Sequence, residues 1–319
     1  MRLFLVINSK NIGAFYKCWK ELSNSVKQVK KKEPDGSLRI YLSGLEGRKK
    51  LLIDTLQWFE EREDLNIHLS GTGLWRYTLD NKRHLTVTGI SNLYILESFA
   101  YIDADDILIP LIPYFKGFML DSGAFTFLQQ QKQKGTTVDF DSYLRKYIDF
   151  INTHQIEQFF ELDVDSLVGY EKVKEYRRTL EQQTGKQCIP VWHKGRGKTE
   201  FLRMCDEYPY VALGGIAIQE IRRSEHHVFS WFIREAHKRG ARIHGLGYTN
   251  LKGLERYHFD SVDSSSWTSG NRFGHIYRFN GRTLVKYDKP PGMRVKPVET
   301  AINNFTEWAK FARYAEKNL

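Results

Sequence analysis

Aspartates and a histidine stand where several apolar runs of the chain end in glycine-rich turns. The runs near 118, 158 and 258 deliver Asp121, Asp163 and Asp263, and the run 188–193 ends on His193. Two carboxylates facing one sugar can act at its anomeric carbon, because one attacks to form a covalent glycosyl intermediate while the other handles the proton of the leaving group. For each aspartate alone, the alternative is a turn or a helix N-cap. Three of them at three such ends favour a shared site.

Glycines accompany these carboxylates in the same turns. They are Gly123, Gly214, Gly215, Gly245 and Gly247. Because glycine has no Cβ, a flat ligand can lie against its backbone. Ordinary tight turns between strands and helices would use the same residues. If the departing group is a nucleobase within a polymer, it must be flipped out of its stack to reach such a pocket.

Alternating short apolar runs and longer amphipathic runs predict the elements that would position these residues. Strands are expected at 38–44, 65–71, 84–89, 118–123, 158–165, 188–193, 210–215, 241–247 and 258–267. Helices are expected at 48–61, 138–154, 167–183, 198–208 and 228–240. This order predicts an α/β fold with a parallel sheet. Six or more such units favour a closed (β/α)8 barrel of the TIM type, with its chemistry at the C-terminal ends of the strands. A doubly wound sheet is the alternative.

We expect a single domain over 1–319. Its N-terminal part, 1–36, is predicted to hold a strand and a helix that ends in a lysine-rich segment. A basic β-hairpin insertion is expected at 268–297, because Asn280-Gly281 is a strong hairpin signal within alternating residues. A C-terminal helix is expected at 300–318, with Thr300 or Asn303 as its cap.

The charge of the chain predicts a polyanionic partner. It has 48 Lys and Arg against 38 Asp and Glu, a net charge of +10, and 14% aromatic residues. This balance fits nucleic acid, although a basic chain can also serve solubility alone. The residues expected to contact nucleic acid are Arg196, Lys198, Trp267, Arg272, Arg278 and Arg282. Trp267 is the candidate for base stacking.

Three scattered cysteines, Cys18, Cys188 and Cys205, indicate a reducing compartment. No apolar run approaches the length of a membrane span, and the first residues are typical of a strand and not of a signal peptide. We therefore expect a cytoplasmic protein. The adjacent pair His226 and His227 is expected at the surface, because neighbouring residues of a helix do not face one another.

Five short segments, in this order along the chain, resemble motifs of the tRNA-guanine transglycosylase superfamily. They are Leu120–Phe125, Phe160–Asp163, Leu213–Ala217 with Glu220, His244–Gly247 and Phe259–Asp263. The first resembles the family's Asp-Ser-Gly-Gly motif, and the fourth resembles its Met-Gly-Val-Gly turn. The likeness extends over residues 118–280, about half the chain.

The resemblance implies a role for each matching residue. Asp263 would be the nucleophile on the sugar, although Asp260 is a rival in the same run, and Asp121 would be the general acid and base. Asp163 would bind the purine edge, and His193 stands where the family often has a glutamine that touches the base. The candidate substrate-binding residues are Ser122, Gly123, Asp163, His193, Gly214, Gly215 and Gly245.

The chain also departs from the tRNA-modifying members of this family. It has no Cys-x-Cys-x-x-Cys cluster for zinc, so neither a metal nor another cofactor is expected. Its first motif has Gly123-Ala124 in place of Gly-Gly, and Ser264–Trp267 replace the family's Pro-Thr-Arg. With these departures it resembles the short phage-associated branch that inserts 7-deazaguanines, such as 7-cyano-7-deazaguanine, into DNA, which implies a bacterial or phage-infected host cell. Exchange on tRNA, a two-carboxylate glycoside hydrolase and an inactive nucleic-acid-binding barrel are the alternatives. Whether the chain pairs with a second copy or a helper protein stays open.

Overall fold

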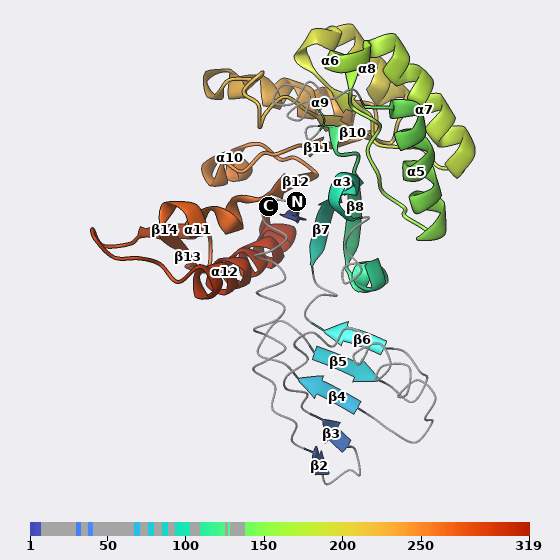
Figure 1. The fold of residues 1–319 in the computed structure, drawn as a ribbon. Helices are drawn as coiled ribbons and strands as arrows, with labels where there is room; N and C mark the ends of the chain where they lie inside the picture. Colours follow the sequence, from blue (N-terminus) through green and yellow to red (C-terminus); the bar gives the residue numbers. More distant parts are fainter. Residues whose placement is uncertain are drawn as a thin grey trace.

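A curled parallel sheet is the centre of the molecule (Figure 1). The computed structural model describes residues 1–7, 30–32, 38–40, 67–70, 76–79, 85–88, 93–102, 109–124, 127 and 138–319. Among them, seven strands pair in the order β8-β7-β1-β12-β11-β10-β9. Their bounds are β1 Arg2–Ile7, β7 Tyr94–Ser98, β8 Gly117–Asp121, β9 Val191–Trp192, β10 Tyr210–Leu213, β11 Arg242–Gly245 and β12 Ser261–Ser264. All six pairings between neighbours are parallel.

The segment 158–161 connects the two edge strands of this sheet, β8 and β9. Leu120 bridges Phe159, and Phe160 bridges Ile189, both in parallel. The predicted strand 158–165 is thus reduced to these bridges, and residues 161–164 have no strand conformation. The expected α/β fold with a parallel sheet is confirmed. The expected eight-stranded closed sheet is observed only as a curled sheet of seven strands, flanked by helices.

Helices between the strands lie outside the sheet (Figure 1). They include α5 Phe140–Thr153, α6 Asp165–Val168, α7 Tyr170–Thr184, α8 Gly197–Glu207, α9 Phe229–Lys238 and α10 Leu251–Arg256. In α5 the buried residues Leu144, Tyr147, Ile148 and Ile151 recur at helical spacing, which is the pattern that predicted this helix. The Asp139 carboxylate caps α5 by accepting from the Ser142 amide at 3.0 Å. The helices predicted at 138–154, 167–183, 198–208 and 228–240 are confirmed, and the helix predicted at 48–61 lies outside the described residues.

The sheet separates two apolar clusters. The inner one contains Phe4, Tyr94, Leu96, Met119, Phe160, Ile189, Val191, Tyr210 and Ala212. Side chains alternate between the faces of a strand, so Asp121 continues the inner row of Met119 and His193 continues that of Val191. The ring of His244 lies against Phe4 and Phe160, which places it on the same side. Polar groups therefore extend the apolar inner face at one end of the strands.

A second sheet contains the early strands. Its five strands, β2 Lys30–Lys32, β3 Leu38–Ile40, β4 Ile67–Ser70, β5 Arg76–Leu79 and β6 Leu85–Thr88, pair in chain order. All these pairings except β3 with β4 are antiparallel. Within the described residues, the strands predicted at 38–44, 65–71 and 84–89 are found as β3, β4 and β6, and they do not belong to the parallel sheet. The helix predicted within 1–36 was expected to end in the lysine-rich segment. That prediction is wrong, because Lys30–Lys32 is a strand.

The C-terminal part contains the predicted hairpin and helix. Strands β13 His275–Phe279 and β14 Leu284–Asp288 pair around Asn280-Gly281, which confirms the hairpin, and α12 spans Pro297–Asn318. Amides of the hairpin donate to side chains of α12, from Tyr277 to Asn304 and from Phe279 to Glu307. Helix α12 begins after Lys296 without a side-chain cap, so the caps predicted at Thr300 and Asn303 are wrong. Short helical segments α3 Phe99–Ile102 and α11 Ser269–Phe273 and the 3-10 segments complete the described chain. None of the described helices is long and apolar enough to cross a membrane.

Candidate active site

Asp121 ends β8 with its side chain half-buried. Its Oδ2 accepts a hydrogen bond from the Gly123 amide at 3.1 Å. Burial raises the pKa of Asp121 to about 6, against the opposing effect of the Gly123 amide, and the charges of Asp263 and Asp163 raise it further. Two carboxylates from distant parts of the chain, Asp163 and Asp263, therefore act on Asp121. A carboxyl whose pKa lies near neutrality is suited to give and take a proton.

Asp263, on β12, is 7% exposed. Its Oδ1 accepts hydrogen bonds from the Gly247 amide at 2.5 Å and from His244 Nε2 at 3.2 Å. The rival Asp260 precedes β12, at the opposite end of the strand, and its Oδ2 accepts from the Ile243 amide at 2.7 Å. Asp260 also pairs with His237 at 2.9 Å. Of the two aspartates, only Asp263 lies with the other carboxylates on the inner face.

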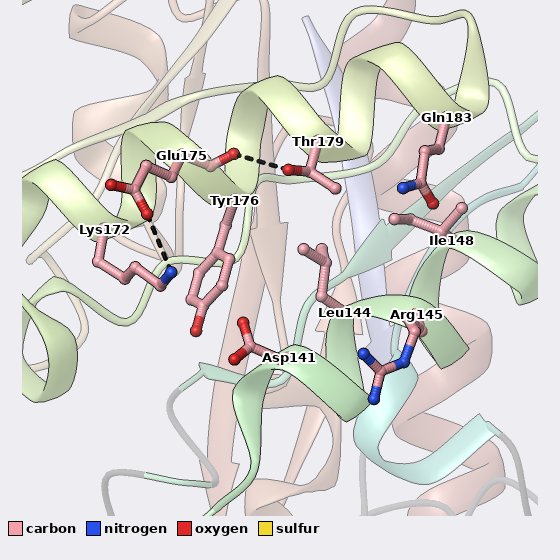
Figure 2. A pocket seen from close by; sticks show the side chains of 9 residues that line it. All are labelled: Asp141, Leu144, Arg145, Ile148, Lys172, Glu175, Tyr176, Thr179 and Gln183. Atoms are coloured by element: carbon pink, nitrogen blue, oxygen red, sulfur yellow. Dashed lines mark hydrogen bonds and ion pairs between the residues drawn. The ribbon is translucent and has the colours of Figure 1, made fainter.

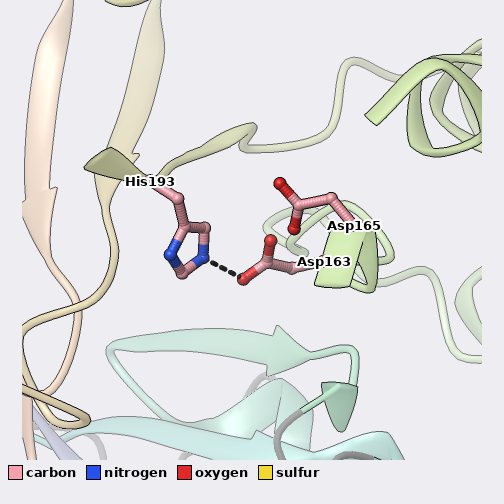
Figure 3. Close-up of side chains that lie close together, drawn as sticks. All are labelled: Asp163, Asp165 and His193. Atoms are coloured by element: carbon pink, nitrogen blue, oxygen red, sulfur yellow. Dashed lines mark hydrogen bonds and ion pairs between the residues drawn. The ribbon is translucent and has the colours of Figure 1, made fainter. Parts of the chain in front are cut away.

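His193 joins two carboxylates. Its Nε2 lies 2.7 Å from Asp163 Oδ2, as Figure 3 shows, and its Nδ1 lies 2.8 Å from Glu220 Oε2. Burial alone would lower the pKa of His193, but the hydrogen bonds and charge of Asp163 and Glu220 raise it to about 9. The ring is thus an imidazolium at neutral pH, and both nitrogens donate to carboxylates. In this arrangement His193 holds Asp163 and Glu220 in place, and neither of its nitrogens is free for a base.

Arg196 is an internal cation. Its side chain is 2% exposed and its guanidinium donates to Glu161 at 2.7 Å, Asp165 at 2.9 Å and Asp163 at 3.2 Å. It also lies 4.3 Å from the centre of the Tyr170 ring. The prediction that Arg196 contacts phosphate is therefore wrong, because carboxylates take its donors. Its role is to balance the acidic cluster and orient Asp163.

Trp267 also differs from its predicted role, whereas the other predicted nucleic-acid contacts stay open. Its side chain is fully buried and packs on Phe305 of α12 at 5.1 Å, so it cannot stack on a base. Arg278 and Arg282 are exposed on the hairpin, and Arg282 pairs weakly with Glu255 at 3.4 Å. Lys198 is exposed at the start of α8. The side chain of Arg272 lies outside the described ones.

The glycines near the site make room for the protein's own side chains. A Cβ on Gly214 would lie 2.9 Å from the His193 ring, and one on Gly215 would lie 2.5 Å from the Glu220 carboxylate. Gly215 has a φ of +76°, which favours glycine. These two glycines are therefore required by the contact of His193 with Glu220. Gly245 is packed against Phe259, Tyr248 and Val262, each about 3.2 Å from where its Cβ would stand.

Ser122 is a buried residue next to Asp121. Its Oγ has no hydrogen-bond partner among the described residues, while its carbonyl accepts from the Tyr143 hydroxyl at 2.8 Å. A buried hydroxyl without a partner is costly in a folded protein. Ser122 is therefore a candidate to bind a ligand at Asp121, as its predicted role requires.

One group of described residues has the donor set of a metal site. Ligand atoms of Asp163, Asp165 and His193 lie within 4.8 Å of one another (Figure 3). However, Arg196 already donates to both aspartates, and His193 carries a positive charge. A metal ion would have to displace these cations. The group therefore fits an internal salt-bridge network better than a metal site.

Two important residues lie beside the predicted ones. Glu161, two residues before Asp163, is fully buried and pairs with Arg177 and Arg196 at 2.7 Å. His244 was noted only as part of a motif, and it contacts Asp263 directly. Its place at the end of the predicted strand 241–247, where the other candidates also stand on their strands, is the signal that could have identified it.

A separate hollow of about 350 Å³ lies between α5 and α7 (Figure 2). Lys172 and Glu175 pair along its edge at 2.9 Å, and Tyr176 and Asp141 point into it from the two helices. It shares no residue with the carboxylate cluster. The hollow is thus a surface feature of the helical layer, away from the inner face of the sheet.

The charge on His193 predicts a pH-dependent stability. Because its folded pKa of about 9 exceeds the ordinary 6.5, the stabilisation is complete below pH 6.5 and is lost as the pH rises through 9. We expect His193→Gln to be less stable than the wild type at pH 6, and this gap to shrink by about 3 kcal/mol at pH 9.5. Urea unfolding of both proteins at the two pH values measures the gap. A gap that does not change with pH would contradict the assignment of this charge.

Comparison with known proteins adds no relative to this geometry. No protein-family model matches the chain. No curated protein matches it either. The function must therefore be argued from the site itself.

Proposed function

We propose that the protein exchanges guanine in a nucleic acid, DNA in preference to tRNA, for a 7-deazaguanine through a covalent bond between Asp263 and the sugar. The observation that carries this proposal is the convergence of Asp163 and Asp263 on Asp121, since the charges of both raise the pKa of Asp121. The likeness of the surrounding motifs to guanine transglycosylases supports the choice of substrate. We also infer that the curled sheet closes into a (β/α)8 barrel, because Phe159 and Phe160 form bridges towards both of its edges.

The chemistry assigns one role to each carboxylate. The free oxygen of Asp263 forms a bond to the anomeric carbon while the bond from that carbon to the guanine nitrogen breaks. The electron pair of the broken bond goes to the guanine, which takes the proton of Asp121. The incoming 7-deazaguanine then returns a proton to Asp121, and its nitrogen attacks the anomeric carbon and releases Asp263. Asp163, held by His193 and Arg196, is available to bind the purine edge.

Incorporation of labelled base tests the proposal. The protein is incubated with DNA or tRNA and with labelled guanine or 7-cyano-7-deazaguanine. Label in DNA supports the proposal as stated, and label in tRNA alone moves the activity to the alternative polymer. If folded protein labels neither polymer, base exchange is wrong. Hydrolysis of small glycosides without affinity for the free deazaguanine would then favour the glycoside hydrolase, and salt-dependent binding without turnover would favour the inactive barrel.

The nucleic-acid contact that we propose is a pocket of about 410 Å³ whose lining includes both chain neighbours of His193. Trp192, Trp231 and Phe232 give it aromatic walls, and Lys194 and Lys198 add positive charge. Lys194 pairs with Glu225 at 2.7 Å, whereas Lys198 lies 5.0 Å from the centre of the Trp231 ring. An aromatic ring and a cation together suit a nucleotide that flanks the exchanged one.

Reversing the charge of Lys198 should weaken binding of DNA. We expect Lys198→Glu to lower the affinity about tenfold at 0.1 M salt and to reduce the slope of log affinity against log salt by about one. Fluorescence anisotropy over a salt series measures both quantities. Lys238→Glu, at the far end of α9, is the matched control. Equal losses in the two variants would show that Lys198 contributes only to the general charge.

A further inference from the structure

A chain of hydrogen bonds lies beneath Asp263. His244 Nε2 is 3.2 Å from Asp263 Oδ1, and His244 Nδ1 is 2.5 Å from Ser261 Oγ. Ser261 Oγ in turn bonds the hydroxyl of Tyr210. The members come from the neighbouring strands β10, β11 and β12, and all four are buried. The chain of hydrogen bonds therefore runs across three adjacent strands of the parallel sheet and is shielded from solvent.

The acceptor at its end fixes the direction of the chain. An ionised carboxylate only accepts, so His244 Nε2 carries a hydrogen. The ring is fully buried between Phe4 and Phe160, and when its one hydrogen is on Nε2, Nδ1 is the acceptor. Ser261 then donates to Nδ1, and Tyr210 donates to Ser261. Every donor points towards Asp263.

We propose that His244 is the positioning residue of the nucleophile. His244 Nε2 and the Gly247 amide both donate a hydrogen bond to Oδ1 of Asp263, so that Oδ2 is left to attack the sugar. Two donors on one oxygen fix the rotation of the carboxylate, and attack depends steeply on such alignment. This inference rests on the proposed function. The motif that His244–Gly247 resembles has methionine at this position, so the hydrogen bond from His244 is a feature of this chain's own sequence.

Two substitutions separate the hydrogen bond from the volume of the ring. His244→Met retains bulk but has no donor, and His244→Gln supplies an amide N–H. In single-turnover reactions with DNA, we expect His244→Met to slow formation of the covalent adduct about 10²-fold, with the KM for free base changed less than threefold. His244→Gln should recover at least about tenfold of that loss. Adduct formation at the wild-type rate in His244→Met would overturn the proposal, as would a glutamine variant no faster than the methionine variant when both melt like the wild type.

A spectroscopic readout requires no activity. In nitrogen-15 NMR of the wild type, labelled at histidine and assigned by the signal lost in His244→Gln, Nε2 of His244 should carry a hydrogen. A hydrogen on Nδ1 alone would overturn the proposal. This result separates two failures: a wild type that exchanges no base refutes the proposed function, whereas the wrong tautomer refutes the contact from His244 to Asp263.

Discussion

Asp263→Asn should abolish base exchange while the protein remains folded. An amide oxygen can still accept from the Gly247 amide and from His244 Nε2, so the local hydrogen bonds persist. An amide is not a nucleophile towards the anomeric carbon, and loss of a nucleophile typically lowers turnover by about 10⁴-fold or more. Label incorporation measures the rate, and trapping of the covalent adduct on denaturing gels shows whether the bond forms.

The neighbouring aspartate provides the matched control for this experiment. Asp260 lies in the same run but bonds the Ile243 amide and His237 at the other end of β12. Asp260→Asn should therefore retain exchange within a fewfold of the wild type. If Asp263→Asn exchanges base at the wild-type rate, the nucleophile is misassigned. If Asp260→Asn is the inactive variant, with its melting temperature unchanged, the two roles must be reversed.

Local periodicity was sufficient to predict the helices and the hairpin. The apolar stripe of α5 and the Asn280-Gly281 turn depend on neighbours within a few residues, so the sequence shows them directly. Which sheet a strand joins depends on distant partners instead. The predicted strands at 38–44 and 65–71 have correct conformations but pair in the second sheet, while β7 at Tyr94–Ser98, absent from the prediction, occupies a position beside β1.

The same distinction applies to the candidate site. The positions of aspartates at the ends of apolar runs indicated that Asp121 and Asp263 belong together, since parallel strands end at one edge. The positions of residues along the apolar runs did not predict that the side chain of Arg196 is buried. Arg196 lies in a run of basic residues that is typical of an exposed loop. Its side chain is nevertheless buried, because its guanidinium pairs with three carboxylates more than 30 residues earlier in the chain, those of Glu161, Asp163 and Asp165. Trp267 was misassigned similarly, because only the packing of α12 covers it.

Asp121→Asn should slow exchange strongly and yet stabilise the protein at neutral pH. The folded pKa of Asp121, about 6, exceeds the ordinary 3.8 because burial disfavours the charged carboxylate. The carboxyl therefore stabilises the fold fully below pH 3.8, and that contribution is lost as the pH rises through 6. Above pH 6 the wild type keeps a buried charge that an amide lacks. A shift of about two units corresponds to about 3 kcal/mol.

Urea unfolding at pH 4.5 and pH 7.5 tests this expectation. The variant's free energy of unfolding should exceed that of the wild type at pH 7.5 by up to about 3 kcal/mol, and the difference should be much smaller at pH 4.5. The same variant cannot protonate the departing guanine, so formation of the adduct should fall about 10²- to 10⁴-fold. A gain in stability that is equal at both pH values would mean that the charge is not its cause. A carboxyl that is held away from water for catalysis lowers the stability of the fold. Its replacement should therefore raise stability and lower activity in the same variant.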